Sequence, residues 1–102
     1  MNLYLKKDPF DSILSGDKTL EVRKFKGNTI DIVNDINILF INKNRNIKVK
    51  VISITHYSDF DNMIKNIDIS LVRKNITRNC YKNILKKCYK NLIGSWVSIK
   101  FL

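Results

Sequence analysis

Hydrophobic and polar residues alternate in several parts of the chain, with the period of two that is typical of half-buried strands. Leu3 and Leu5 alternate with Asn2 and Tyr4 near the start, and similar alternation recurs further along. The pattern predicts strands over residues 2–5, 19–25, 36–41, 47–55 and 95–101. Residues 29–33 are either a further short strand or an irregular linker.

The clearest predicted hairpin joins residues 36–41 to residues 47–55. The five residues between them, 42–46, are rich in Asn and Lys, and asparagine in particular tolerates turn conformations. In the second strand the apolar side chains of Ile47, Val49 and Val51 alternate with lysines. We therefore expect one face of this strand to be buried and the other to be basic.

A first helix is predicted to begin at Asp8-Pro9, with Asp8 as the capping residue and proline at the first helical position. Gly16 is expected to end it in a left-handed conformation. The helical spacing predicts one apolar face made of Phe10, Ile13 and Leu14.

A second, short helix is predicted from the capping-box pattern of residues 58–61, with Ser58 as the cap and Met63 and Ile64 facing inward. Tyr57 and Ser58 then lie at a corner between strand and helix, which makes them candidate ligand-binding residues. Tyr57 fits a core position with an exposed hydroxyl equally well. Residues 67–76 are expected to connect to the next helix and to contain at most a helical turn.

The last helix is predicted from Thr77 onward, because apolar residues recur at helical spacing as far as Leu92 while lysines occupy the other side. We expect its apolar face to pack on the sheet. Its two cysteines are eight residues apart, about 12 Å along a helix, which is too far for a disulfide. Buried thiols are expected at these positions, Cys80 and Cys88.

The closing strand divides its side chains between two faces. Val97, Ile99 and Phe101 share one face, and Trp96 shares the other with Ser98 and Lys100. If that second face lines a cleft, Trp96 is a base-stacking platform. The alternative, which is the commoner fate of a single tryptophan, is a core side chain.

Length and charge narrow the protein's class. A chain of 102 residues with 44% hydrophobic residues is expected to form one domain over residues 1–102 with a single modest core. Nineteen Lys and Arg against nine Asp and Glu give a formal net charge of +10, which favours polyanionic partners. The alternative is a lysine-rich surface that serves solubility.

No apolar stretch has the length of a signal peptide's core or of a membrane span, so a soluble cytoplasmic protein is expected, with no membrane partner. His56 has no cysteine or histidine nearby, and no metal-ligand spacing occurs. The sequence therefore predicts neither a metal site nor a cofactor, and it leaves the oligomeric state open.

The segment 15–23 contains four residues of chemical interest at the predicted junction of helix and strand. Alternation places Leu20 and Val22 on one face and Glu21 and Arg23 on the other, about 7 Å apart at Cα. Lys18 lies at the beginning of the strand. Such a cluster can bind phosphate or move a proton, or it can be a surface ion-pair cluster of little energetic value.

These residues follow the pattern GxKxxExR, in which Gly16, Lys18, Glu21 and Arg23 fill the four fixed positions. In this pattern, and in the elements around it, the chain resembles the ASCH domain family of the PUA-like superfamily, and in length its small stand-alone members. The resemblance implies an α+β fold, a compact mixed or antiparallel β-barrel of five to six strands with two to three flanking helices. It also implies that the four motif positions lie in a cleft, in a family associated with RNA binding and RNA-directed chemistry.

Three functions remain open. The first is binding of RNA or a nucleotide in a cleft that contains Lys18, Glu21, Arg23, Lys24, Tyr57, Ser58 and Trp96. Surrounding lysines are expected to contact phosphates as well: Lys48, Lys50, Lys82, Lys86, Lys87 and Lys90. The second is hydrolysis of RNA or of a modified nucleoside, similar to the family's N4-acetylcytidine amidohydrolases. In that case Lys18 and Glu21 are the catalytic residues: Glu21 is the general base, Lys18 stabilises the oxyanion, and Arg23 orients both. The amidohydrolases are associated with a threonine three positions after the lysine and a glutamate in the second half of the chain. Here Glu21 replaces the threonine, and the second half of the chain has no glutamate. We therefore do not assign their activity to this chain. The third is a protein-partner module with a vestigial cleft.

Overall fold

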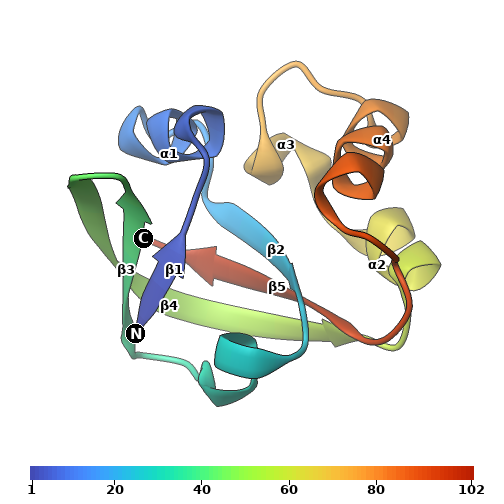
Figure 1. Ribbon diagram of the computed structural model, residues 1–102, viewed down its shortest axis with the longest axis horizontal. Coiled ribbons are helices and arrows are strands. Elements are labelled where there is room, and N and C mark those ends of the chain that lie inside the picture. Colours follow the sequence, from blue (N-terminus) through green and yellow to red (C-terminus); the bar gives the residue numbers. More distant parts are fainter.

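The computed structural model describes residues 1–102, whose backbone forms five strands, four α-helices and one 3-10 helix (Figure 1). In chain order the elements are β1 (Asn2–Tyr4), α1 (Lys7–Leu14), β2 (Leu20–Lys24), η1 (Gly27–Asp31), β3 (Asn37–Asn42), β4 (Arg45–Tyr57), α2 (Phe60–Asn66), α3 (Ile69–Val72), α4 (Arg78–Cys88) and β5 (Trp96–Phe101).

All five strands belong to one mixed sheet in the order β1-β3-β4-β5-β2. β1 runs parallel to β3, and the other neighbours are antiparallel. The long strand β4 takes part in both halves of the sheet, and its register shifts between Val51 and Ser53, which is the kind of irregularity that bends a strand. The sheet therefore curls into a half-barrel whose edges are β1 and β2. The predicted α+β class and barrel-like architecture are confirmed, with one short helix more than expected.

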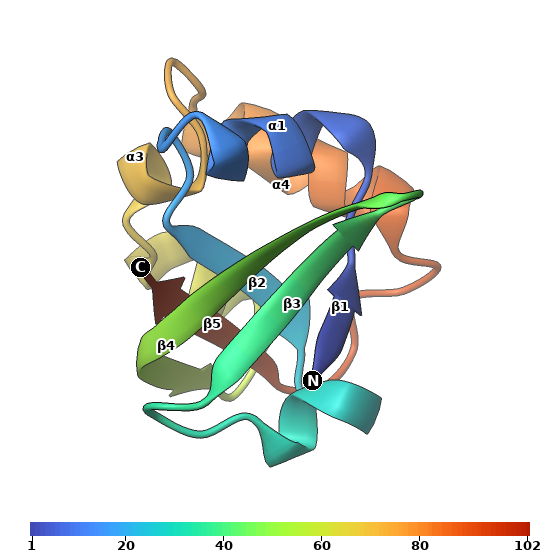
Figure 2. The ribbon, with the colours of Figure 1, turned by 90° about the vertical axis from the view of Figure 1, so that its left-hand side faces the viewer.

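The hairpin of β3 and β4 is confirmed, and Figure 2 shows it as the long pair of strands facing the viewer. Its turn is at Lys43, whose φ is +55°. Val49 and Val51 are buried, whereas Lys48 and Lys50 are exposed. One face is apolar and the other basic, as the alternation predicts.

The sheet has a hydrophobic core on each of its faces. The inner core lies within the half-barrel and combines residues of β1, α1, β3, β4 and β5, among them Phe10, Phe40 and Ile99. The outer core lies between the sheet and helices α2, α3 and α4, and includes Trp96 and Met63. Alternation along β5 supplies both cores, because successive side chains point to opposite faces of a sheet. The single core expected from composition is thus divided in two.

Helix α1 begins two residues earlier than expected, and its cap is Lys6 rather than Asp8, without a side-chain hydrogen bond. Gly16 does end it, with a φ of +85°. Phe10 and Ile13 are buried as predicted, but Leu14 is 64% exposed. The prediction for Leu14 was wrong because the buried stripe is centred between Phe10 and Ile13, and Leu14 lies beyond its edge on the last turn.

The other helices are capped by short polar side chains. Asp59 rather than Ser58 caps α2, accepting a hydrogen bond of 2.7 Å from the backbone N–H of Asn62. Thr77 caps α4 as expected. Residues 27–31, part of which was considered as a strand, form the 3-10 helix η1.

Helix α4 ends at Cys88, four residues before the predicted stripe ends. Tyr81 and Leu85, one helical turn apart, are its buried residues. Cys80 and Cys88 are both exposed free thiols, so the expectation of buried thiols was wrong. Cys80 is turned away from Tyr81 by about 100°, the rotation of one residue, and Cys88 is the last residue of the helix, three residues beyond Leu85.

We predict that Ile13→Ala lowers the free energy of unfolding by about 2–5 kcal/mol, because it leaves a cavity in the inner core. The neighbouring Leu14→Ala is the matched control, and its effect is expected to stay below about 0.5 kcal/mol, as for most exposed positions. Urea unfolding measures both, with the m-value checked for constancy. Equal losses in the two variants would contradict the orientation of α1.

Candidate functional site

The four motif residues lie at the seam between the two edge strands of the half-barrel. Gly16 ends α1 in a left-handed turn, and the backbone N–H of Lys18 then bonds to the carbonyl of Ser12 in α1 at 3.0 Å. This turn brings the chain directly from α1 into β2. In β2, Glu21 and Arg23 pair with Ile99 and Val97 of β5, which belong to the inner core. The charged side chains therefore point to the inner side of the sheet.

Lys18, Glu21 and Arg23 form a three-residue ion cluster. The Lys18 ammonium lies 3.2 Å from Oε1 of Glu21, and Nε of Arg23 donates to Oε2 of Glu21 at 2.8 Å. The side chains of Lys18 and Glu21 are only 5% and 8% exposed. An exposed ion pair contributes little, but this one is buried, so loss of a single partner would leave an uncompensated charge.

Burial by itself raises the pKa of the Glu21 carboxyl, but the charges of Lys18 and Arg23 outweigh it and hold that pKa below its ordinary value. In the same way burial lowers the pKa of Arg23, and the carboxylate of Glu21 more than offsets it. Glu21 and Arg23 are therefore both ionised at neutral pH. With the ammonium of Lys18, the cluster formally has two cations and one anion.

Backbone carbonyls hold the two cations in place. The Lys18 ammonium donates to the carbonyl of Leu20 at 2.8 Å. Arg23 reaches across the seam, where Nη2 donates to the carbonyl of Tyr4 in β1 at 2.8 Å. Its remaining nitrogen, Nη1, has no partner within the protein, and the side chain is 24% exposed. Arg23 thus joins the two edges of the sheet and keeps one donor group for a ligand.

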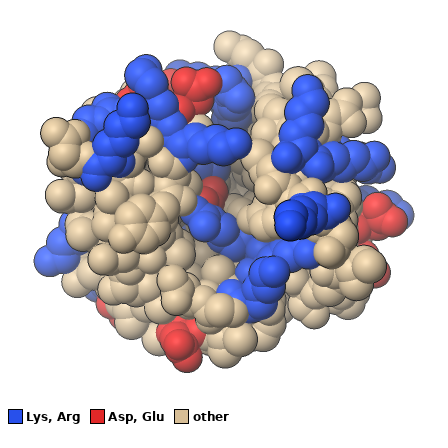
Figure 3. Space-filling model, in the orientation of Figure 1, with Lys and Arg blue, Asp and Glu red and all other residues tan.

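A cleft of about 340 Å³ opens beside this cluster. Segments around β1, α1, β2 and α4 line it, and Figure 3 shows this face hollowed near its centre, with basic side chains around the hollow and an acidic group deep inside it. Eight of its thirteen lining residues are hydrophobic. Its charged residues are Lys6, Lys18, Glu21 and Arg23.

Two tyrosines of the α4 region form part of the cleft wall. Burial raises the pKa of the Tyr81 hydroxyl, and the nearby carboxylate of Glu21 adds to the effect. Burial also raises the pKa of Tyr89, whose ring packs edge-on against Trp96 with centroids 5.0 Å apart. Both hydroxyls stay protonated at neutral pH. The wall thus offers aromatic surface and neutral polar groups next to the cations.

Lys24 is near the cleft but does not line it. Its ammonium bonds to Oδ1 of Asn91 at 2.9 Å and lies 5.9 Å from the centroid of the Tyr89 ring. The lysine lines two adjoining hollows instead.

Trp96 lies in the outer core and is completely buried. Its indole N–H donates to the carbonyl of Leu92 at 3.2 Å, and its ring packs edge-on against Phe60. No face of the ring is open for a base to stack on. Of the two positions considered for Trp96, the structure therefore shows the core side chain and not the base-stacking platform.

Tyr57 and Ser58 are also apart from the cleft. The Tyr57 hydroxyl is 3.3 Å from Oγ of Ser98, and Tyr57 lines a separate hollow of about 160 Å³ that shares no residue with the cleft. Ser58 is exposed next to the cap of α2. Of the seven predicted site residues, the structure brings together Lys18, Glu21 and Arg23.

Sequence reasoning missed the contribution of Tyr81 and Tyr89 to the cleft. Both belong to the predicted apolar stripe of α4, which was interpreted as packing surface alone. Their place in that stripe was a usable signal, because aromatic side chains of such a stripe can also line a pocket. The sequence did not show which of them would do so.

No cluster of three or more His, Cys, Asp or Glu side chains is arranged to bind a metal ion. None of the helices combines the length and apolar character needed to span a membrane.

The chain is similar to one protein family in sequence and to solved structures in fold. The family model of the ASCH domain matches residues 3–100. Among solved structures, the one titled "Crystal structure of hypothetical protein PH0355" is similar, with a TM-score of 0.79 and 21% sequence identity over 99% of this chain and 97% of that chain. At this identity the likeness concerns the fold. No curated protein matches the chain.

We predict that Glu21→Gln destabilises the protein by about 3–5 kcal/mol, because it leaves two cations close together without their buried counter-charge. Asp11→Asn is the control. It removes a carboxylate from ion pairs with Lys7 and Arg45 that are more than a third exposed, so only a small loss is expected. Chemical denaturation at pH 7 measures both, and a small effect of Glu21→Gln would show that the cluster is solvated.

The difference in stability between the wild-type protein and Glu21→Gln is expected to depend on pH. Because the folded-state pKa of Glu21 is lowered from its ordinary value of 4.5, the ionised carboxylate stabilises the fold above that value. This contribution is lost as the pH falls from 4.5 through the folded-state pKa. Unfolding measured from pH 7 to pH 3 should show the two proteins converging, and a constant difference would refute the lowered pKa.

Proposed function

Because this chain belongs to the ASCH domain family, we propose that its cleft binds a nucleotide, either free or as part of an RNA strand. ASCH domains are generally RNA-binding, and the ion cluster of this chain occupies the positions of the family motif. The proposal rests on one observation above all: a buried cluster with net positive charge forms one side of a cleft whose other side is aromatic.

The charge of the cleft favours an anion. Lys6, Lys18 and Arg23 face a single carboxylate, Glu21, among its lining residues. The unpartnered Nη1 of Arg23 and the remaining N–H of Lys18 are suitable donors for phosphate oxygens, and charge-assisted hydrogen bonds of this kind are stronger than neutral ones. A phosphate would offset the net charge of the ion cluster without any rearrangement of its internal pairs.

The apolar wall suits a base. Tyr81, Tyr89, Ile84 and Leu85 line the cleft opposite β1 and β2. Aromatic surface binds nucleic-acid bases by stacking, with little dependence on sequence. The volume of about 340 Å³ lies within the range of about 300–1,000 Å³ typical of small-molecule sites. One nucleotide is therefore a suitable occupant, with its phosphate at the ion cluster and its base at the wall.

The state of Glu21 argues against a role as general base. Both of its oxygens are engaged by cations, and its pKa is below the ordinary value. An effective general base has a pKa near the working pH. Glu21 is better suited to hold Lys18 and Arg23 in position, which favours binding over hydrolysis.

We predict that Arg23→Gln weakens binding of ribonucleoside monophosphates by about tenfold or more, because a hydrogen bond to a charged group contributes about 1.5–3 kcal/mol. Arg45→Gln is the matched control. Arg45 pairs with Asp11 and packs over Phe10, away from the cleft, so it should change the affinity less than twofold. Calorimetric titration of all four monophosphates measures the effect, and circular dichroism confirms that both variants are folded.

Arg23→Lys supplies a further comparison, because it keeps the charge and loses the second donor nitrogen that reaches β1. Its affinity should lie between those of the wild-type protein and Arg23→Gln. Equal weakening by Arg23→Gln and Arg45→Gln would mean that only net charge matters, and binding elsewhere on the surface would then explain the affinity.

Binding without chemistry is the expected result when the protein is incubated with N4-acetylcytidine and with short RNAs. Mass spectrometry should recover these compounds unchanged. The retained fraction of the RNAs, which carry phosphates, should fall as salt increases. Product that forms with the wild-type protein and not with Lys18→Met would establish a hydrolase instead. A retained fraction indifferent to salt would argue against phosphate binding.

A further inference from the structure

Two more hollows continue from the cleft along the surface. The first has a volume of about 200 Å³ and shares Arg23 and Tyr89 with the cleft. The second has a volume of about 350 Å³ and shares Lys24 and Lys26 with the first. Each hollow therefore adjoins the next through two shared residues, and the three together follow β2 from its buried middle to the loops beyond its end.

We propose that these three hollows form one continuous track for a single-stranded oligonucleotide, with about one nucleotide in each. The track comprises the cleft and the two hollows at the end of β2. This inference rests on the proposed function, and it adds that the ligand is a strand of about three nucleotides rather than a single one.

The charge along the track is consistently positive. Its cations are Lys6, Lys18, Arg23, Lys24 and Lys26, and its only carboxylate, Glu21, is already paired inside the cleft. Neither outer hollow has an acidic residue among its lining residues. A phosphate backbone thus meets at least one cation in each hollow, which is what binding of a single strand requires.

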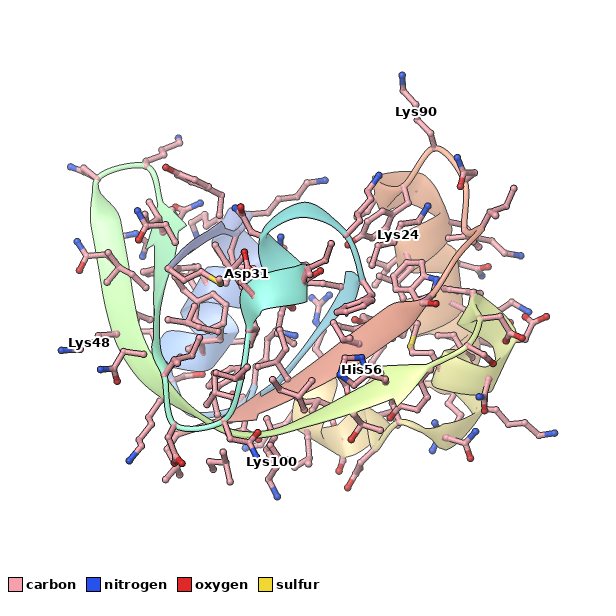
Figure 4. All side chains as sticks on the ribbon, turned by 90° about the horizontal axis from the view of Figure 1, so that it is seen from below. Lys24, Asp31, Lys48, His56, Lys90 and Lys100 are labelled. Carbon is pink, nitrogen blue, oxygen red and sulfur yellow. The ribbon has the colours of Figure 1, made fainter.

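The structure fixes the backbone that carries the outer cations. The buried Thr29 hydroxyl accepts a hydrogen bond from the backbone N–H of Lys26 at 2.9 Å and lies 2.6 Å from the carbonyl of Lys24, to which it can donate. The turn between β2 and η1 is fixed by these bonds. Figure 4 shows Lys24 between η1 and the loop that follows α4, where its ammonium is tethered to Asn91.

Apolar surface accompanies these charges. The Tyr89 ring is half-buried and borders both the cleft and the first outer hollow. Phe25 and Ile93 line the last hollow, and Ile93 is 82% exposed. A base can contact apolar side chains in every part of the track while its phosphate meets a cation.

The hollow beside Tyr57 lacks these properties. It shares no lining residue with the cleft or with the two outer hollows, and its charged residues, Lys100 and Asp68, have opposite signs. Continuity and charge together distinguish the track from this other depression of the surface.

The test is a length series. Ribo-oligonucleotides of one, two, three and six residues, each of mixed sequence, are titrated into the full-length protein. We expect affinity to rise about tenfold from one residue to three and less than threefold from three to six. The slope of log K against log salt should steepen by about 0.7 for each phosphate added within the track.

In the double variant Lys24→Gln with Lys26→Gln, affinity should no longer rise when the oligonucleotide is lengthened from one to three nucleotides. The added salt dependence should disappear as well. The control is Lys48→Gln with Lys100→Gln, which removes the same charge from exposed positions on other sides of the molecule (Figure 4). It should retain this rise in affinity.

Three results would overturn the proposal. If the single nucleotide binds and affinity does not depend on length, the track is refuted and the proposed function still holds. If both double variants lose the length-dependent rise in affinity equally, that rise comes from net charge, and the track is again refuted. If no oligonucleotide binds at any length, both the track and the proposed function fail.

Discussion

The buried contact between Glu21 and its two cations is the interaction on which the rest of the site depends. Two positive side chains so close together repel each other, and moving them out of water costs free energy. The carboxylate offsets both effects, and the backbone carbonyls of Leu20 and Tyr4 satisfy further donors. The cluster therefore holds its cations in place before any ligand arrives, which lowers the cost of ordering them on binding.

The position of this cluster follows from how the sheet is covered. Helices α2, α3 and α4 bury one face of the sheet, and the curl of the half-barrel with α1 buries the other. β2 contributes to both sides, since Leu20 and Val22 join the outer core while Glu21 points inward. At the edge of β2 the two cores do not meet, and the cleft occupies the space between them. Tyr89 marks this boundary, with its ring against Trp96 on one side and the cleft on the other.

Strand alternation, the glycine that ends α1 and the charged motif could be predicted from the sequence, whereas the caps of α1 and α2 were each misplaced by one or two residues. Gly16 had to follow the helix because a left-handed residue was needed there, and the alternation around Val49 and around Glu21 identified the strands and their faces. The motif brought Lys18, Glu21 and Arg23 together because three residues of one short strand and its entry cannot lie far apart. These features depend on near neighbours in the chain, and the structure agrees with them.

What could not be predicted depends on distant contacts. Whether Trp96 faces a cleft or a core is decided by the helices that cover β5, and whether Cys88 is buried is decided by the angle at which α4 crosses the sheet. Leu14 matches the periodicity of its helix as well as Ile13 does, yet only Ile13 reaches the inner core. The aromatic wall of the cleft was missed for the same reason, since it forms only where α4 and Tyr89 meet the residues around β1 and β2.

One consequence concerns how such a site can change during evolution. The edge strands β1 and β2 do not pair with each other. Instead, the side chain of Arg23 spans the gap between them and donates a hydrogen bond to the Tyr4 carbonyl. A barrel sealed entirely by its backbone can widen only by adding or shifting a strand. Here the width of the opening is set by the length of one residue, so a point substitution can resize the aperture while the scaffold keeps its topology.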